Sequence, residues 1–298
     1  MEIQKYLQAI LAKHSIDEDS PEVTPLRGEK KKVEKVLRDN FNESTISIQY
    51  AGSYKKGTMI KDSYDLDIIC YFNYDDSSPG DTLEDIYNNT KNALEEKYSV
   101  DTKKSALRIK SSEGTDFHID VVPGRFTDNT KEDVFLYQSF GEKGMLKTNL
   151  NKHINHIKDS KLINTIKLIK IWKQINSLDI KTFILELLVI KVLDKKEDGD
   201  GLENCLIGFW EKLRDGINEI SIEDPANPTG NDLTHLFNNN VKLSLSSTAK
   251  KTLDSIENEN WENIFGTSED VSKAYKISSI QAIKKDSDNP SKPWCDRI

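Results

Sequence analysis

The sequence predicts an α+β fold, with a mixed sheet in the N-terminal half and a helical lobe after it. Short apolar runs with strand-like alternation occur at residues 44–50, 65–72 and 116–122. After about residue 145, apolar residues recur instead at helical spacing. We therefore expect a first lobe over residues 1–145, including two N-terminal helices, and a helical lobe over residues 146–298 that closes a cleft against it.

The first lobe is expected to begin with two helices joined by a turn near Pro21 and Pro25, the second ending near Phe41. A further helix is predicted over residues 82–98 and a short strand over residues 107–110. Pro123 is expected to stop the strand that begins at residue 116, because proline cannot donate to a sheet ladder. The first helix is marked by a stripe of Ile3, Tyr6, Leu7, Ile10 and Leu11.

In the helical lobe, residues 183–193 are apolar almost all round, which is typical of a helix buried at the centre of its domain. The acidic stretch at residues 194–201 is interpreted as a loop. It does not match a calcium-binding EF-hand, because Lys196 stands at the third position, where an oxygen ligand is required. A preceding helix is marked by a stripe of Leu162, Ile163, Ile166, Ile169 and Trp172.

The charge balance bears on the class of partner. With 42 basic and 50 acidic residues, the net charge of 42 − 50 = −8 argues against binding long nucleic acid by bulk attraction. The run at residues 27–38 holds six basic and two acidic residues, and we interpret it as a solvated helix face, with a local basic groove as the alternative. No stable long nucleic-acid partner is expected.

Location and redox state follow from simple features. No run of 18 apolar residues suggests a membrane span, and the N-terminus lacks the basic-then-apolar order of a signal peptide, so a cytoplasmic protein without a membrane partner is expected. Cys70, Cys205 and Cys295 form no CxxC pair and are interpreted as packing thiols.

The stretch at residues 52–67, in which a Gly-Ser turn is expected to follow one strand and two aspartates open the next, carries the clearest chemical signal. Asp65 and Asp67 are two residues apart at the start of a strand, so both carboxylates project from one face. Carboxylate oxygens of this kind suit Mg²⁺ shared with substrate phosphates. Gly52 allows the backbone to approach a ligand closely, and Ser53 offers an N–H and a hydroxyl to the outer phosphates of a nucleotide.

A third carboxylate is predicted from the strand at residues 116–122, where Asp116, His118 and Asp120 share a face. If Asp120 lies beside Asp65 and Asp67, two divalent ions could be held as in nucleotidyl transfer, with catalysis mainly by positioning and charge neutralisation. His118 is interpreted as a hydrogen-bonded strand residue rather than a catalytic one.

This combination of Gly-Ser, eleven intervening residues, Asp-x-Asp and a distant strand aspartate resembles the polymerase-β-like nucleotidyltransferase superfamily. Residues 168–172, 182–188 and 224–231 are similar to the helical half of oligoadenylate synthetases and of the cGAS/DncV-like nucleotidyltransferases of bacterial anti-phage signalling. The resemblance implies a polymerase-β-like mixed sheet with a C-terminal helical lobe that closes a nucleotide cleft.

The resemblance also implies an activity, a synthase that joins nucleoside triphosphates, ATP among them, into a cyclic or short linear second messenger read by a downstream effector. Two Mg²⁺ ions, with Mn²⁺ as a substitute, would be held by Asp65 and Asp67, and the second also by Asp120, which would accept the acceptor hydroxyl's proton. The donor nucleotide would be bound by Gly52, Ser53, Lys170, Thr182 and Phe183. Phenylalanine stands where the family often has a base-stacking tyrosine.

Several nearby residues have simpler interpretations. Lys167 is a possible helper of Lys170 one turn earlier, and Glu186 is expected to pair with a lysine or a backbone amide, because an unpaired buried charge is costly. His153 and His156 lack partners at zinc-ligand spacing. Two other functions stay open: a template-independent transferase acting on RNA ends or a protein hydroxyl, and a nucleotide-sensing module without catalysis.

Overall fold

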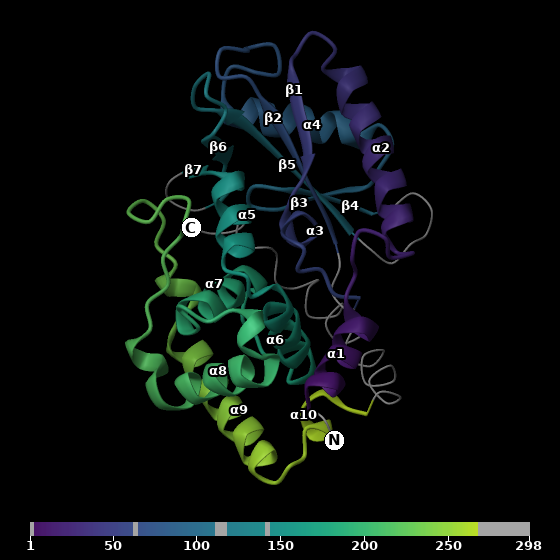
Figure 1. The fold of residues 1–298 in the computed structure, drawn as a ribbon. Coiled ribbons are helices and arrows are strands. Elements are labelled where there is room, and N and C mark those ends of the chain that lie inside the picture. Colours follow the sequence, from purple (N-terminus) through teal and green to yellow (C-terminus); the bar gives the residue numbers. More distant parts are fainter. Residues whose placement is uncertain (1–2, 62–64, 111–117, 141–143, 268–298) are drawn as a thin grey trace.

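A computed structural model describes residues 3–61, 65–110, 118–140 and 144–267 of the chain. It contains a sheet half, at the top in Figure 1, and a helical half below it. Within the described residues the sheet has seven strands in the order β1-β2-β5-β4-β3, with β6 pairing β5 and β7 on β6. β2 and β5 are parallel and the other pairs antiparallel, which confirms the predicted mixed sheet. The strands are β1 (Ile46–Tyr50), β2 (Leu66–Phe72), β3 (Val100–Thr102), β4 (Leu107–Lys110), β5 (His118–Phe126), β6 (Val134–Tyr137) and β7 (Met145–Thr148).

One face of the sheet is covered by α2 (Val23–Asn40) and α4 (Leu83–Glu95), which pack against each other and the central strands. Leu66 and Ile68 of β2 belong to this apolar core. Because strand side chains alternate, the intervening Asp67 points to the opposite face. α4 begins where predicted, with Thr82 and Asp85 in a reciprocal capping box.

The helical half is built around a buried aromatic cluster of Trp172, Phe209 and Trp210. Its helices are α5 (Leu150–Asp159), α6 (Ile163–Ile175), α7 (Thr182–Val192), α8 (Leu202–Gly216), α9 (Asn239–Glu257) and α10 (Glu262–Phe265). α7 is buried over Phe183–Val189, as its apolar sequence predicts. Among the helices of the described residues, none combines the length and apolar character needed to cross a membrane.

The first helix packs against residues that are distant in the sequence. α1 (Ile3–His14) places Leu7 and Ile10 in the same core as Ile169 and Trp172, so it packs in the helical half rather than on the sheet. Figure 1 shows α1 beside α10, while α2 runs along the sheet. The apolar stripe of α1 therefore packs against residues more than 150 positions away in the sequence. The division of the chain into lobes at residue 145 stays a prediction.

Two local expectations are wrong. β5 does not stop at Pro123 but continues to Phe126. Pro123 is tolerated because β5 pairs with β4 only as far as Val121 and with β6 only from Arg125, so the proline lies between the two partner strands on that side. The segment after β1 is not a simple turn, because it forms the short helix α3 (Gly52–Lys56).

Other sequence expectations are confirmed in the described part of the chain. Cys70 and Cys205 are buried free thiols, and burial raises the pKa of each; Cys295 lies outside the described residues. The acidic stretch at residues 194–201 is a loop with one short 3-10 turn, in which Asp198 accepts hydrogen bonds from the first turn of α6. In the basic run on α2, Lys31 and Lys35 are exposed.

Candidate functional site

Three predicted aspartates lie at one edge of the sheet, and we call them the acid row: Asp65, Asp67 and Asp120. Asp67 and Asp120 are directly opposite each other in the parallel pair β2 and β5, so the predicted neighbourhood is confirmed. Asp65 immediately precedes β2, on the same face as Asp67. Asp67 and Asp120 are each 1% exposed, whereas the Asp65 side chain is 28% exposed. Asp116, expected on this face, falls outside the described residues.

Arg108, a cationic residue that was not among the predicted site residues, lies beside the acid row. Arg108 of β4 is directly opposite Asp120. Its guanidinium donates through Nε to Asp120 Oδ1 at 2.8 Å and through a terminal nitrogen to Oδ2 at 2.9 Å. The same nitrogen lies 3.7 Å from Asp65 Oδ2. In the sequence, Arg108 stands between the apolar residues Leu107 and Ile109 of a predicted strand. This pattern by itself indicates only that Arg108 lies on the polar face of the strand.

Gly52 is held directly against the acid row. The backbone N–H of Ala51 donates to the Asp67 carbonyl at 2.8 Å, which joins the start of α3 to β2. Gly52 has a φ of +55°, and a Cβ at this position would stand 1.6 Å from Asp67 Oδ2. Only glycine therefore fits here without moving the carboxylate. Ser53, the next residue, is half-buried at the beginning of α3.

Lys170 lies in a second charged group, the lysine cluster, which consists of Lys56, Lys170 and Glu186. Lys170 is 3% exposed, and its Nζ donates to the Thr58 carbonyl at 2.6 Å and lies 3.9 Å from Glu186 Oε1. Glu186 also accepts hydrogen bonds at 2.8 Å from Lys56 Nζ and from the Thr58 hydroxyl. The predicted lysine partner of Glu186 is thereby confirmed, and the phosphate contact of Lys170 stays a prediction.

The charge state of Glu186 follows from this cluster. Burial raises the pKa of a carboxyl, but the charges of Lys56 and Lys170 and the bonds from Lys56 and Thr58 outweigh it, so the pKa is lowered. Glu186 is therefore ionised at neutral pH. Lys167, the suggested helper, is paired elsewhere, with its Nζ 2.7 Å from Asp17 Oδ1.

Two further residues predicted to bind the donor nucleotide, Thr182 and Phe183, lie at the start of α7. Thr182 is half-buried as the first residue of α7. Phe183 is only 3% exposed, because His153 packs edge-on at 5.0 Å between ring centroids and Lys56 Nζ lies 5.2 Å from its ring centre. Stacking of a base on Phe183 stays a prediction that requires these neighbours to move.

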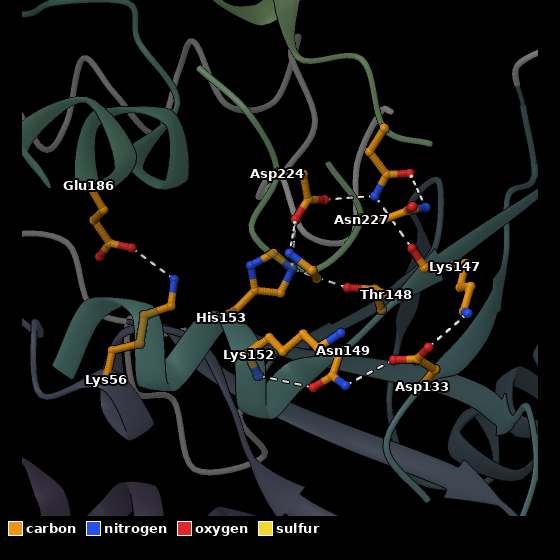
Figure 2. A network of polar contacts seen from close by, with 12 residues as sticks. Lys56, Asp133, Lys147, Thr148, Asn149, Lys152, His153, Glu186, Asp224 and Asn227 are labelled. Carbon is orange, nitrogen blue, oxygen red and sulfur yellow. Dashed lines mark hydrogen bonds and ion pairs between the residues drawn. The ribbon is translucent and has the colours of Figure 1, made fainter. Parts of the chain in front are cut away.

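His153 ties the segment at residues 224–231 to α5, as Figure 2 shows. Its Nε2 lies 3.1 Å from the Thr148 hydroxyl and 3.5 Å from Asp224 Oδ1. Burial lowers the pKa of His153 to about 4, although the nearby Asp224 opposes this. Asp224 in turn accepts a hydrogen bond from Asn231 at 2.6 Å. These contacts give the segment a structural role at the edge of β7.

The acid row offers the donor atoms that a divalent ion requires. Its three carboxylates supply the hard oxygen donors that Mg²⁺ prefers. Two of them, Asp67 and Asp120, lie opposite each other on the neighbouring strands β2 and β5. Nevertheless, no three His, Cys, Asp or Glu side chains of the described residues converge as a ready metal site. Arg108, which bridges Asp120 and Asp65, is the cation observed among them. The donor chemistry therefore fits, while the observed arrangement is held by arginine.

The hollows of the surface do not mark the acid row. A cavity of about 200 Å³ is lined by residues of the α1–α2 connection, α3 and the end of α5, none of them predicted site residues. A smaller one, with space for about one water molecule, lies between Gly52, Lys56, Tyr71 and His153. Of the residues discussed above, its lining includes Gly52 and Lys56 but no member of the acid row. The strand register therefore locates the site better than cavity size does.

The chain is similar to one protein family and to several solved structures. The model of the Second Messenger Oligonucleotide or Dinucleotide Synthetase domain, abbreviated SMODS, matches residues 1–160. Among curated protein sequences, no relative matches. The solved structure of CdnG from Bradyrhizobium diazoefficiens in complex with GTP gives a TM-score of 0.69 at 12% identity, over 95% of this chain and 99% of that one.

Two further solved structures support the same fold. The E. coli CdnC:HORMA-deltaN complex gives a TM-score of 0.68 at 19% identity, over 89% of this chain and 97% of that one. DncV from Vibrio cholerae, described as a cyclic AMP-GMP synthase, gives 0.62 at 16% identity, over 83% and 77%. At these identities the likeness establishes the fold, and it confirms the predicted polymerase-β-like arrangement of a mixed sheet with a helical lobe.

Proposed function

This chain is a nucleotidyltransferase of the Second Messenger Oligonucleotide or Dinucleotide Synthetase family, and from that premise we propose that it joins nucleoside triphosphates into a cyclic or short linear second messenger, releasing pyrophosphate. ATP is the first substrate to consider. The observation that carries this proposal is the acid row, in which Asp67 and Asp120 are register partners with Asp65 at the open edge.

The acid row would hold two divalent ions, Mg²⁺ or in its place Mn²⁺. Asp65 and Asp67 would contact both ions, and Asp120 the second. Ions bound there would supply activation of the attacking hydroxyl and charge neutralisation on the leaving pyrophosphate. Asp65, the most exposed of the three, is the member that the cation of a metal-bound triphosphate would reach first.

The remaining residues would position the nucleotides. Ser53, half-buried beside Gly52, would bind the outer phosphates of the donor through its N–H and hydroxyl. Lys170 would join it by exchanging the Thr58 carbonyl for a phosphate oxygen, a stronger acceptor for an ammonium group. Asp120 would accept the acceptor hydroxyl's proton, since each carboxylate oxygen keeps a lone pair beyond the one that Arg108 occupies.

The biological setting follows from the family resemblance. A cyclic or oligomeric nucleotide has value to a cell only if a receptor reads it, so we propose a downstream effector and a role in anti-phage signalling in the cytoplasm. The net charge of −8 favours free nucleotides over long RNA as substrates, because an RNA groove requires a basic face.

The test is synthesis of product from labelled ATP, GTP, CTP and UTP, singly and mixed, with Mg²⁺ or Mn²⁺. Wild-type protein should form a phosphatase-resistant product, and Asp67→Asn should lower its rate by about 10³-fold, because losing an ion ligand costs several kcal/mol of transition-state stabilisation. The matched control is Asp128→Asn, an exposed aspartate that only caps a turn.

The outcomes separate the alternatives. Equal product from wild type and Asp67→Asn would refute the proposed role of the acid row. Extension of added RNA, or label attached to a protein hydroxyl, would indicate the template-independent transferase. Metal-dependent binding of nucleotide without turnover would indicate a sensing module.

A further inference from the structure

Arg108 is the residue of the site whose presence the proposed chemistry does not explain. It lies opposite Asp120 on β4, at the end of a row in which β2, β5 and β4 contribute Asp67, Asp120 and Arg108 in register. Its side chain is 11% exposed and its bonds to Asp120 are bidentate. A bidentate arginine fixes the plane of a carboxylate as well as its charge.

The charges explain why an arginine is favoured here. Counted by formal charge, three carboxylates and one guanidinium give 1 − 3 = −2 for these four groups. Carboxylates this close would repel one another without a cation, and burial strengthens the repulsion. Arginine keeps its charge at any physiological pH, so the compensation is permanent.

The contact with Asp65 shows that Arg108 does more than pair with one acid. The terminal nitrogen bonded to Asp120 also lies 3.7 Å from Asp65 Oδ2. Arg108 thus joins the most exposed acid to one of the two buried acids. A cation drawn to Asp65 and Asp120 would meet a guanidinium that these two carboxylates already share.

We infer that Arg108 is the resting counter-cation of the acid row, which holds Asp120 in position before divalent ions bind and competes with those ions for Asp65 and Asp120. This inference rests on the proposed function, because it takes the acid row as the ion-binding group. Arg108 is a positioning residue, since it acts on substrate only through the carboxylates. It sets how tightly the enzyme binds its ions in the absence of nucleotide.

The test compares Arg108→Met with Arg108→Lys in the full chain without nucleotide. Mn²⁺ binding is followed by the paramagnetic resonance signal of the free ion, and thermal unfolding is recorded in EDTA and in Mn²⁺. The methionine variant should bind Mn²⁺ roughly tenfold or more tightly than wild type, because a competing positive charge is gone. It should also unfold at a lower temperature in EDTA and gain more from Mn²⁺ than wild type does.

The lysine variant separates charge from geometry. It keeps the positive charge, so its Mn²⁺ affinity should stay within about threefold of wild type, but a single ammonium group cannot replace the bidentate fork. Product formation should therefore fall by about tenfold while ion binding is retained. A merely structural arginine would lower stability in both variants equally in EDTA and in Mn²⁺.

Arg214→Met is the matched control, because Arg214 makes the same bidentate contact with Asp215 at 2.7 Å in an exposed position on α8. Its Mn²⁺ affinity should equal that of wild type. If Arg108→Met does not fold, Arg108→Gln carries the same expectation. Mn²⁺ binding by wild type that neither neutral variant tightens would overturn the inference alone. Absence of Mn²⁺ binding in wild type would overturn the ion-binding role of the acid row, and this inference with it.

Discussion

The acid row and the lysine cluster each bring several charged side chains together in the fold, but their net charges have opposite signs. With Arg108 the acid row combines three carboxylates and one cation, whereas the lysine cluster combines two ammonium groups and one carboxylate. The acid row opens to solvent through Asp65, while Lys56, Lys170 and Glu186 are all buried. The excess negative charge of the acid row suits cations, and the excess positive charge of the lysine cluster suits an anion. A metal-bound nucleoside triphosphate carries both kinds of charge.

The two groups are joined through the segment that follows the Gly-Ser pair. Gly52 contacts Asp67, and Thr58, five residues after Ser53, bonds to Lys170 and Glu186. A change in either group therefore reaches Ser53 through a short stretch of chain. The Gly-Ser segment is therefore fixed at its start by the backbone bond from Ala51 to Asp67 and after its end by the charged partners of Thr58.

Removing the carboxylate of the lysine cluster should have the largest effect on stability. Glu186→Ala leaves two buried ammonium groups without their carboxylate, which should cost about 3–5 kcal/mol of unfolding free energy in urea at pH 7. Glu197→Ala is the control, because its pair with Lys161 is exposed to solvent and should contribute far less to stability. Equal losses of unfolding free energy in the two variants would show that the buried ion pairs of the cluster contribute no more to stability than an exposed pair does.

The contact between Gly52 and Asp67 can be tested by two glycine substitutions. Gly52 and Gly57 both have positive φ, but a Cβ at Gly57 would have nothing within 4 Å. Gly57→Ala should therefore cost only the backbone strain of about 1–2 kcal/mol. Gly52→Ala should cost about 1–3 kcal/mol more from overpacking and should displace Asp67, abolishing turnover. Equal stability and activity of the two variants would contradict the close approach seen here.

The smallest expected effect concerns pH and His153, whose neighbour Lys56 belongs to the lysine cluster. The pKa of His153 is lowered to about 4, mainly by burial. As the pH falls, His153 therefore binds a proton near pH 6.5 in the unfolded chain but only near pH 4 in the folded chain. The stability that neutral His153 supports is complete above pH 6.5 and is lost as the pH falls towards 4.

Between pH 7 and pH 5, wild type should therefore lose about 2 kcal/mol more unfolding free energy than His153→Gln. Urea denaturation of both proteins at the two pH values measures this difference. His156, whose pKa is also lowered by burial, is present in both proteins and cancels in the comparison. The same pH dependence in both would mean that His153 is protonated in the folded chain.

The local patterns of the sequence predicted the elements that bear the acids. Asp65 and Asp67 alternate with buried residues of β2, so their common face follows from a period of two. The Gly-Ser spacing and Asp120 predicted the family, which the SMODS match confirms. That Glu186 has a structural partner, a lysine or a backbone amide, was also predictable, because an unpaired buried acid is costly.

Other features were decided by contacts between distant residues. The pairing of β4 with β5 brings Arg108 to Asp120, and the burial of Lys170 depends on Thr58, 112 positions earlier in the chain. The missed strands β3, β6 and β7 are only three or four residues long, too short for a periodic signal.

The sequence by itself thus determined which residues carry negative charge on one strand face, and through them the class of chemistry. Only the tertiary structure decided which cations stand against those charges, Arg108 for the acid row and two lysines for Glu186. The physical reason is that alternation along a strand is a local property, whereas the neighbour across a sheet or between helices is set by register and packing of the whole chain.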